Sequence, residues 1–199
     1  HAEEIGAKLL RVQRDFDFAS MESVQWNYRF HPQSSDGQSR NRNSLPFPAL
    51  RGAYQLSNAA CALTVLECLN EQLPVDIGAI KRGLLLVENP GRFQVLPGRP
   101  LVVLDVGHNP HAARALRRSL INLAFAQKRT AVFSMLSDKD IDGVLEIVKD
   151  QFDEWYIAPL DVPRGMTAEA LQAKLEAQNI ENIQTFTSVR EAYRAALAK

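Results

Sequence analysis

The sequence has 199 residues, of which 23 are Lys or Arg and 23 are Asp or Glu, so the formal net charge is zero. This balance gives no reason to expect a nucleic-acid or acidic-membrane partner, because both attract basic chains. An apolar content of 46% is ordinary for a protein that buries a core, and no apolar run approaches the roughly 18 residues of a membrane span. The length allows one large domain or two small ones.

The cysteines and the start of the chain indicate the compartment. No secretory signal opens the sequence. Cys61 and Cys68 are seven residues apart on a predicted helix, which is too far for a disulfide. We therefore expect free, buried thiols, as in a reducing cytoplasm.

The first part of the sequence predicts a small strand-containing region. Residues 10–18 and 26–30 alternate apolar and polar side chains, which is typical of strands with one wet face. Residues 31–44 are polar almost throughout and predict a solvated loop. Arg40 and Arg42 fall inside this loop, so we assign them no function.

Apolar residues at helical spacing predict the end of a helix over residues 1–10 and a full helix over residues 55–69. Asp76 caps a further helix, which stops at Asn89-Pro90-Gly91. The end of this helix is the best candidate for a domain boundary. Before it, the predicted strands and helices follow no regular order, whereas after it strands and helices alternate regularly.

The second part alternates strands and helices. The predicted strands cover residues 93–96, 101–104, 130–135, 155–158 and 183–186, and the predicted helices begin at Pro110, Ile141, Thr167 and Ser188. Such alternation is typical of an α/β fold with a mostly parallel, doubly wound sheet and right-handed crossovers.

The stretch from Leu101 to Ala112 organises this second part. Leu101–Leu104 is a short apolar run that predicts a buried strand of the parallel sheet. Asp105 and His108 follow it, at the carboxyl edge where open α/β folds bind ligands. A carboxylate there suits two ribose hydroxyls, but Asp105 is equally well explained as a strand end and His108 as a surface residue. The spacing alone does not choose between these interpretations.

Two further polar groups surround this stretch. The planar guanidinium of Arg92, beside Gly91, can bind a phosphate, although Arg92 is equally well interpreted as an ordinary surface residue. The run Ser137–Asp140 follows another predicted strand, and we expect it at the same edge of the sheet as Asp105. The lysine within this run is either a catalytic residue or part of a solvated helix start. The sequence has no phosphate loop, no dinucleotide fingerprint, no nucleophile elbow and no close Cys/His spacing for a metal.

Asn89-Pro90-Gly91-Arg92-Phe93-Gln94, followed by Leu104-Asp105-Val106-Gly107-His108-Asn109-Pro110-His111-Ala112, closely resembles the folate-type members of the Mur ligase family. Matches at residues 55–60, 135–140, 155–160 and 163–165 extend the resemblance over the whole chain. It implies that residues 1–90 are the C-terminal part of a central ATP-binding domain. Residues 91–199 would then be a Rossmann-like C-terminal ligase domain that lacks its last strand.

The resemblance also implies an activity, that of an ATP-dependent acid–amino-acid ligase of folate biosynthesis. Such an enzyme phosphorylates a pterin-linked carboxylate, and the amine of L-glutamate attacks the acyl phosphate. Asn58 would contact the adenine, Arg92 the phosphates and Asp105 the ribose, with His108 as the catalytic candidate. ATP and Mg²⁺ would be the cofactors, and no metal ligand is expected within these 199 residues. The implied partners are ATP, L-glutamate and dihydropteroate or a folate, bound by a cytoplasmic monomer without nucleic acid or membrane.

The phosphate loop and the metal ligands of the family are expected before residue 1, so we expect these 199 residues to be inactive alone. Two alternatives stay open. One is a non-catalytic nucleotide-binding or interaction module of the same fold. The other is a peptidoglycan-type Mur ligase, whose members tend to carry different residues after the equivalent Asp-x-x-His; the run Asp105–His111 argues against it.

Overall fold

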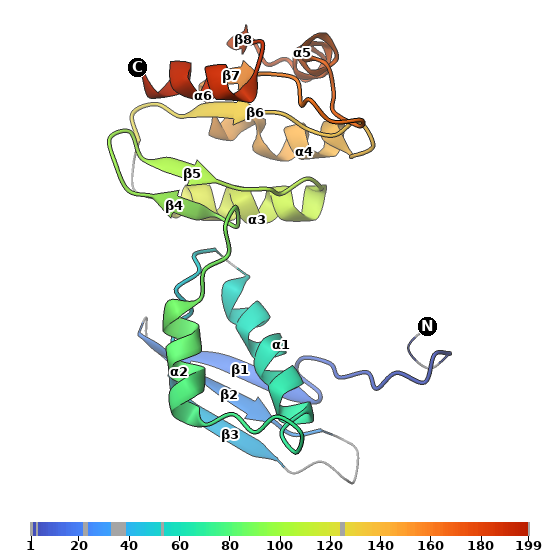
Figure 1. The fold of residues 1–199 in the computed structure, drawn as a ribbon, viewed down its shortest axis with the longest axis vertical. Coiled ribbons are helices and arrows are strands. Elements are labelled where there is room, and N and C mark those ends of the chain that lie inside the picture. Colours follow the sequence, from blue (N-terminus) through green and yellow to red (C-terminus); the bar gives the residue numbers. More distant parts are fainter. Residues whose placement is uncertain are drawn as a thin grey trace. The chain divides into compact units, whose positions relative to one another are not determined.

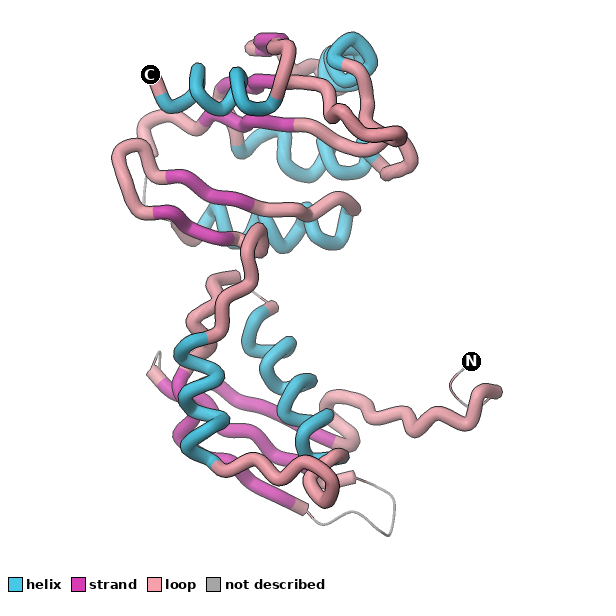
Figure 2. Tube along the Cα trace, viewed as in Figure 1, coloured by secondary structure: helices cyan, strands magenta, loops and turns pink. Residues whose placement is uncertain are grey.

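The computed structural model describes residues 2, 4–21, 24–32, 39–52, 54–123 and 126–198. The chain forms two compact units, His1–Asn89 and Pro90–Lys199, and each is described by itself (Figures 1 and 2). Within the described ranges, no helix combines the length and the apolar character that a membrane crossing requires.

The first unit is an antiparallel sheet covered by two helices. Its strands, in the order β1-β2-β3, are β1 (Phe16–Met21), β2 (Gln25–Phe30) and β3 (Arg40–Pro46). Helix α1 (Gln55–Cys68) packs over β1 and β2, and α2 (Ile77–Leu86) packs along β3 (Figure 1). The core lies between sheet and helices and includes the fully buried side chains of Trp26, Tyr28 and Leu45.

The periodic segments of this unit are confirmed. The strand at 26–30 and both helices form where the patterns predict them, and the Asp76 side chain caps α2 by accepting the Ala79 N–H at 2.9 Å. The Asp76 pKa is lowered, chiefly by this backbone hydrogen bond. Cys61 and Cys68 are free as expected, but both are exposed rather than buried, because they lie on the face of α1 that points away from the sheet.

Three predictions of secondary structure in this unit are wrong. Residues 2 and 4–10 form no helix, since Gly6 has a left-handed φ of +66°. The strand begins only at Phe16, because the chain turns at Gln13, which also has a positive φ. The polar loop predicted to run to residue 44 ends before Arg40, where β3 begins; an edge strand has only one neighbour and tolerates polar residues. Residues 33–38 lie outside the described part of the chain.

The second unit contains a parallel sheet and a hairpin. The parallel strands, in the order β6-β7-β8, are β6 (Thr130–Phe133), β7 (Glu154–Ile157) and β8 (Ile183–Thr185). The antiparallel hairpin pairs β4 (Gln94–Leu96) with β5 (Val102–Leu104). The helices are α3 (Pro110–Ile121), α4 (Ile141–Val148), α5 (Ala168–Ala177) and α6 (Val189–Leu197), with a 3₁₀ turn at Lys149–Gln151. This confirms an α/β fold with a parallel sheet.

Strand β7 shows why the parallel sheet is covered on both faces. Trp155 and Ile157 are buried in the core that contains residues of α4 and α5, whereas Tyr156 and Ala158 are buried against Ala192 of α6. Successive strand residues point to opposite faces, so a continuous apolar run implies two buried faces.

One central expectation is corrected. Leu101–Leu104 is not a buried strand of the parallel sheet, because β5 pairs antiparallel with β4 and Leu101 is 50% exposed. The connection between β4 and β5 contains only the turn around Gly98 and Pro100, which is too short for the crossover that parallel strands need.

Four side chains cap the helices of the second unit. Asn109, Asp140, Thr167 and Ser188 each accept the N–H of the residue three positions later, at 2.9, 3.0, 3.2 and 3.3 Å. These caps satisfy N–H groups that have no partner inside the helix. They also fix the loops that follow β5, β6, β7 and β8.

Candidate functional site

Asp105 joins two loops of the second unit. Its Oδ2 accepts the Phe93 N–H at 2.9 Å and its Oδ1 accepts the Gly107 N–H at 2.7 Å. A third bond runs from the Val106 N–H to the Gly91 carbonyl at 2.8 Å. We call this set of three bonds the Asp105 clip. Gly91 is required there, because its φ is +73° and a Cβ would lie 2.8 Å from a Val106 methyl group.

The clip determines how Arg92 and Asp105 are presented. Arg92 is exposed between Gly91 and the buried Phe93, which adopts a positive φ of 45°. Asp105 is itself exposed, and a carboxylate has about four lone-pair positions, of which the two backbone N–H groups use two. Asp105 therefore does more than follow the end of a strand, because its carboxylate joins two loops. The carboxylate also keeps lone pairs that can accept hydrogen bonds from a ligand.

His108 has a defined ring orientation. Its Nδ1 lies 3.0 Å from the Val106 carbonyl oxygen, and the ring is exposed. A carbonyl only accepts, so Nδ1 carries a hydrogen and the neutral ring keeps its lone pair on Nε2. The geometry leaves Nε2 available as a proton acceptor.

The loop after β6 leads into α4, whose start lies beside the start of α3, but the predicted common sheet edge is not formed, because β5 and β6 belong to different sheets. Helices α3 and α4 pack together, and a Cβ on Gly143 would lie 2.9 Å from the Pro110 ring. The N-termini of the two helices are therefore neighbours, and Asp140 caps α4 by accepting the Gly143 N–H at 3.0 Å. Lys139 is paired with Asp138, with its Nζ 3.4 Å from Asp138 Oδ2.

Asp138 also meets Arg164, which comes from the loop after β7. Arg164 Nη1 lies 2.7 Å from Asp138 Oδ2, so two cations approach one carboxylate oxygen. Desolvation raises the pKa of Asp138, but the charges of Arg164 and Lys139 outweigh it and hold this pKa below its usual value. The carboxylate stays ionised at neutral pH.

A surface pocket of about 440 Å³ lies beyond this loop, at the carboxyl ends of β7 and β8. Its lining includes Pro159, Thr167, Glu169, Thr185, Thr187 and Glu191. The pKa of Glu169 is lowered by its own backbone N–H and by the Thr167 hydroxyl. None of the predicted site residues lines this pocket.

The predicted site residues fall into both units. Asn58 belongs to the first unit, where it lies near the start of α1, is exposed and donates from Nδ2 to Gln55 Oε1 at 3.3 Å. Arg92, Asp105 and His108 belong to the second unit, where the Asp105 clip brings their loops together.

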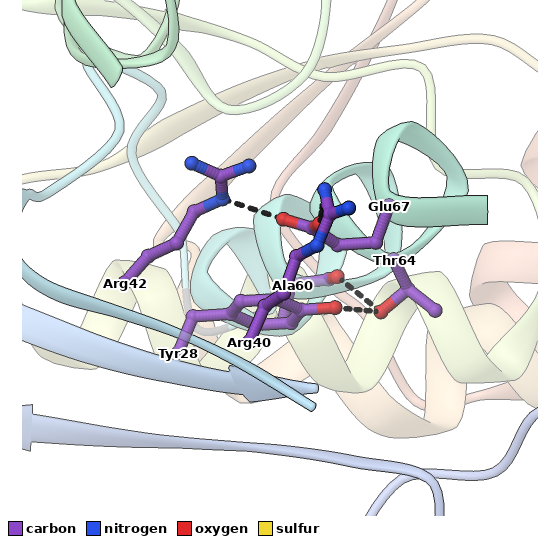
Figure 3. Close-up of polar contacts among 6 residues, drawn as sticks. All are labelled: Tyr28, Arg40, Arg42, Ala60, Thr64 and Glu67. Atoms are coloured by element: carbon purple, nitrogen blue, oxygen red, sulfur yellow. Dashed lines mark hydrogen bonds and ion pairs between the residues drawn. The ribbon is translucent and has the colours of Figure 1, made fainter. Parts of the chain in front are cut away.

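A buried polar network in the first unit was not predicted from the sequence (Figure 3). The Glu67 side chain on α1 is only 1% exposed and pairs with Arg42 Nε at 2.5 Å and Arg40 Nη1 at 3.2 Å. These two arginines are not solvated loop residues. Their spacing of two places them on one face of β3, and this alternation is the signal that could have identified them.

A second set of buried polar contacts in this unit involves Tyr28. Its hydroxyl lies 2.8 Å from Thr64 Oγ1, which donates to the Ala60 carbonyl oxygen at 2.8 Å (Figure 3). Burial raises the pKa of Tyr28 to about 12. All of these polar groups are partnered within the unit, which indicates a structural role.

The described residues offer no metal site of their own. In the described part of the chain, no group of three or more His, Cys, Asp or Glu side chains is arranged to hold a metal ion. We therefore derive no chemical step through a metal from these residues.

Several known proteins are similar to this chain. Dihydrofolate synthase/folylpolyglutamate synthase of Escherichia coli (strain K12) is 38% identical over 177 residues, which is 88% of the chain and 39% of that protein. Folylpolyglutamate synthase of Lacticaseibacillus casei is 29% identical over 176 residues, or 87% of the chain and 40% of that protein. The chain thus spans about two fifths of the length of these relatives.

Solved structures and a family match agree with this likeness. Escherichia coli FolC in complex with DHPP and ADP superposes with a TM-score of 0.80 at 37% identity, over 100% of this chain and 43% of that one. A bifunctional folylpolyglutamate synthase/dihydrofolate synthase with Mn, AMPPNP and L-glutamate bound gives 0.78 at 39%, over 100% and 43%. Residues 91–199 match the family domain described as "Mur ligase, glutamate ligase domain". This match covers more than half of the residues of the chain, so the chain belongs to the Mur ligase family.

Proposed function

We propose that these 199 residues are part of an ATP-dependent ligase that joins L-glutamate to dihydropteroate or to a folate through an acyl phosphate. The observation that carries this proposal is the 38% identity, over 88% of the chain, with the Escherichia coli enzyme named dihydrofolate synthase/folylpolyglutamate synthase. The partners are accordingly small molecules bound by a cytoplasmic monomer.

The domain assignment is part of the proposal. Residues 1–90 are the C-terminal part of the central ATP-binding domain, and residues 91–199 are the C-terminal ligase domain without its last strand. The compact units that meet after Asn89, and the family match that starts at residue 91, support this division.

Three residues serve the nucleotide in this proposal. Asn58 contacts the adenine through its exposed amide, and Arg92 reaches the phosphates from the exposed turn beside Gly91. Asp105 accepts the ribose hydroxyls with the lone pairs that the clip leaves unused. Relatives have been solved with ADP, or with AMPPNP and Mn, so we expect the whole ligase to use ATP with a divalent metal. The described residues offer no cluster for that metal, so its ligands are expected elsewhere in the ligase.

The chemistry follows from the poor electrophilicity of a carboxylate. Transfer of the γ-phosphoryl group to the pterin-linked carboxylate turns one carboxylate oxygen into part of a leaving group. The amine of glutamate then attacks the carbonyl carbon, an amide forms, and ADP and phosphate leave. In this proposal His108 accepts a proton from the glutamate ammonium through Nε2; the contact of its Nδ1 with the Val106 carbonyl, at 3.0 Å, supports this role.

A chimera tests the proposal. The segment of the Escherichia coli enzyme that aligns with this chain is replaced by residues 1–199, and phosphate release is measured with ATP, dihydropteroate and L-glutamate. We expect release that requires all three compounds, and none from the isolated 199 residues, because their sequence has no phosphate loop.

The alternative function makes the opposite prediction in the same assay. A folded chimera that binds ATP but releases no phosphate would contradict the ligase function and favour a non-catalytic nucleotide-binding module. Circular dichroism and ADP binding of the chimera show whether it is folded, so a negative result remains informative.

A further inference from the structure

The charges on and around helix α3 are all of one sign. The chain as a whole is neutral, yet from Val106 to Ser137 its sequence contains no Asp or Glu. The basic residues of this stretch are Arg114, Arg117, Arg118, Lys128 and Arg129. The first three lie on α3, so a neutral protein concentrates positive charge on one helix.

The arginines of α3 form one exposed face. Arg117 and Arg118 follow Arg114 by three and four positions, and all three are exposed. Residues at these spacings are neighbours on a helix surface. We call these three side chains the α3 arginine face. The apolar side of the helix is already used, because Ala113 and Leu120 are buried and α3 packs against α4. The helix therefore offers only its arginine face to a partner, which does not suit insertion into a membrane.

The arginine face differs from other cations of the second unit in having no internal counter-ion. Lys128, Lys149 and Lys174 each lie 2.7–2.8 Å from a carboxylate oxygen of this unit. Among the described residues, neither Arg114 nor Arg117 has an ion-pair partner. No acidic side chain on α3 is available to neutralise them. Both guanidinium groups can therefore bind an external anion.

The arginine face begins beside the candidate site. Helix α3 starts at Pro110, two residues after His108, and the Asn109 cap fixes this start. The helical rise places Arg114 roughly 6 Å and Arg117 roughly 11 Å beyond Pro110 along the axis. The face is thus short, and an anionic chain that leaves the candidate site along α3 meets one arginine after another.

We propose that the α3 arginine face binds the glutamyl chain of a folate that already carries several glutamates. This inference rests on the proposed ligase function. Glutamate has two carboxylates, and each residue that is joined to the chain through one of them keeps the other. The chain is therefore a row of carboxylates. A guanidinium binds a carboxylate with two parallel hydrogen bonds, so a row of arginines on one helix face matches it.

A nucleic acid is the other polyanion to which a basic helix could bind. Nucleic-acid affinity depends on many phosphate contacts at once. Here the excess of cations is confined to a helix of 12 residues on a chain without net charge. A short glutamyl chain needs only a few contacts, so the observations favour it.

An NMR titration of the 199-residue chain with γ-linked penta-L-glutamate at low salt tests this inference. We expect the Nε–H signals of Arg114 and Arg117 to shift. The affinity should rise from glutamate to the pentamer and fall with added salt. The double variant Arg114→Gln/Arg117→Gln should bind the pentamer about tenfold more weakly, because two exposed ion pairs are lost.

The double variant Arg190→Gln/Arg194→Gln on α6 is the matched control. It also removes two exposed arginines from one helix, but α6 carries Glu191 as well. We expect its affinity for the pentamer to equal that of the unchanged chain. Unchanged amide spectra away from the substitutions confirm that both variants are folded. In an active chimera, the α3 variant should raise the KM for a folate pentaglutamate about tenfold relative to the KM for the monoglutamate.

Three results would overturn the inference. The pentamer leaves the Arg114 and Arg117 signals unmoved, the α6 control loses as much affinity as the α3 variant, or a single-stranded oligothymidylate moves the same signals at lower concentration than the pentamer. An active chimera without the pentamer contact would remove this inference only, whereas an inactive chimera with the contact would remove the ligase function only.

Discussion

The two units of the chain use paired charges in opposite ways. In the first unit, Glu67 is buried between Arg40 and Arg42, and the hydrogen bonds of this network stay within the unit. In the second unit, Asp138 and Arg164 pair on exposed loops whose backbones are held by other contacts. The same ion-pair chemistry is thus buried in one unit and exposed to solvent in the other.

The comparison can be measured because each unit contains one of the two tryptophans, both fully or almost fully buried. Trp26 reports on the first unit and Trp155 on the second. Incorporation of 5-fluorotryptophan gives two ¹⁹F signals, so the unfolding of each unit can be followed separately in one sample.

The largest effect is expected for Glu67→Ala. Removing one partner of a buried ion pair costs roughly 3–5 kcal/mol, and the 35% exposure of Arg40 places this case near 3 kcal/mol. Urea titration should show an earlier transition of the Trp26 signal and an unchanged Trp155 transition. The exposed Glu71→Ala serves as the control. Equal shifts of both signals would show that the units do not unfold separately.

Alkaline pH should weaken the first unit through Tyr28. Its folded-state pKa of about 12 lies above the ordinary value of 10.0, so its contribution is complete below pH 10 and is lost as the pH rises toward 12. Two pKa units correspond to about 2–3 kcal/mol. We expect the stability of Tyr28→Phe to fall less over this range than that of the unchanged chain. Parallel pH curves for the two proteins would contradict the burial argument.

A smaller effect on stability is expected for Asp105→Ala, because its carboxylate is exposed and water screens it. The Phe93 and Gly107 N–H groups lose their acceptor, which should cost the second unit about 1 kcal/mol. In the chimera the same variant should weaken ATP binding about tenfold, through loss of the ribose contact. Calorimetric melting and nucleotide titration of one sample separate the two effects. Lost stability with unchanged ATP affinity would leave Asp105 a structural residue only.

The smallest effect concerns the acid titration of Asp138. Because its pKa is held below 3.8, the pair with Arg164 should persist above the unfolded-state pKa and break only as the pH falls through the lower folded-state value. The Asp138 carboxyl carbon, followed by NMR, should titrate at higher pH in Arg164→Gln. Identical titration curves would show that Arg164 does not act on this carboxylate.

The predictable features are those set by neighbours in the sequence. The caps Asn109, Asp140, Thr167 and Ser188 and the helices behind them follow from short-range spacing. The Phe93–Asp105 bond of the clip and the Glu67 pairs were not predictable in this way, because their partners are 12 and 25–27 positions apart and depend on a hairpin and an edge strand. The direction of β5 was missed because its apolar run does not distinguish a hairpin strand from a parallel one.

The most direct test of the ligase function follows one oxygen atom. Dihydropteroate labelled with ¹⁸O in its carboxylate is incubated with the chimera, ATP and L-glutamate, and the released phosphate is examined by ³¹P NMR. An acyl phosphate breaks at the carbonyl carbon, so one labelled oxygen should appear in each phosphate formed. Phosphate without label, released in step with ADP, would show that ATP is hydrolysed without activating the carboxylate and would contradict the proposed function.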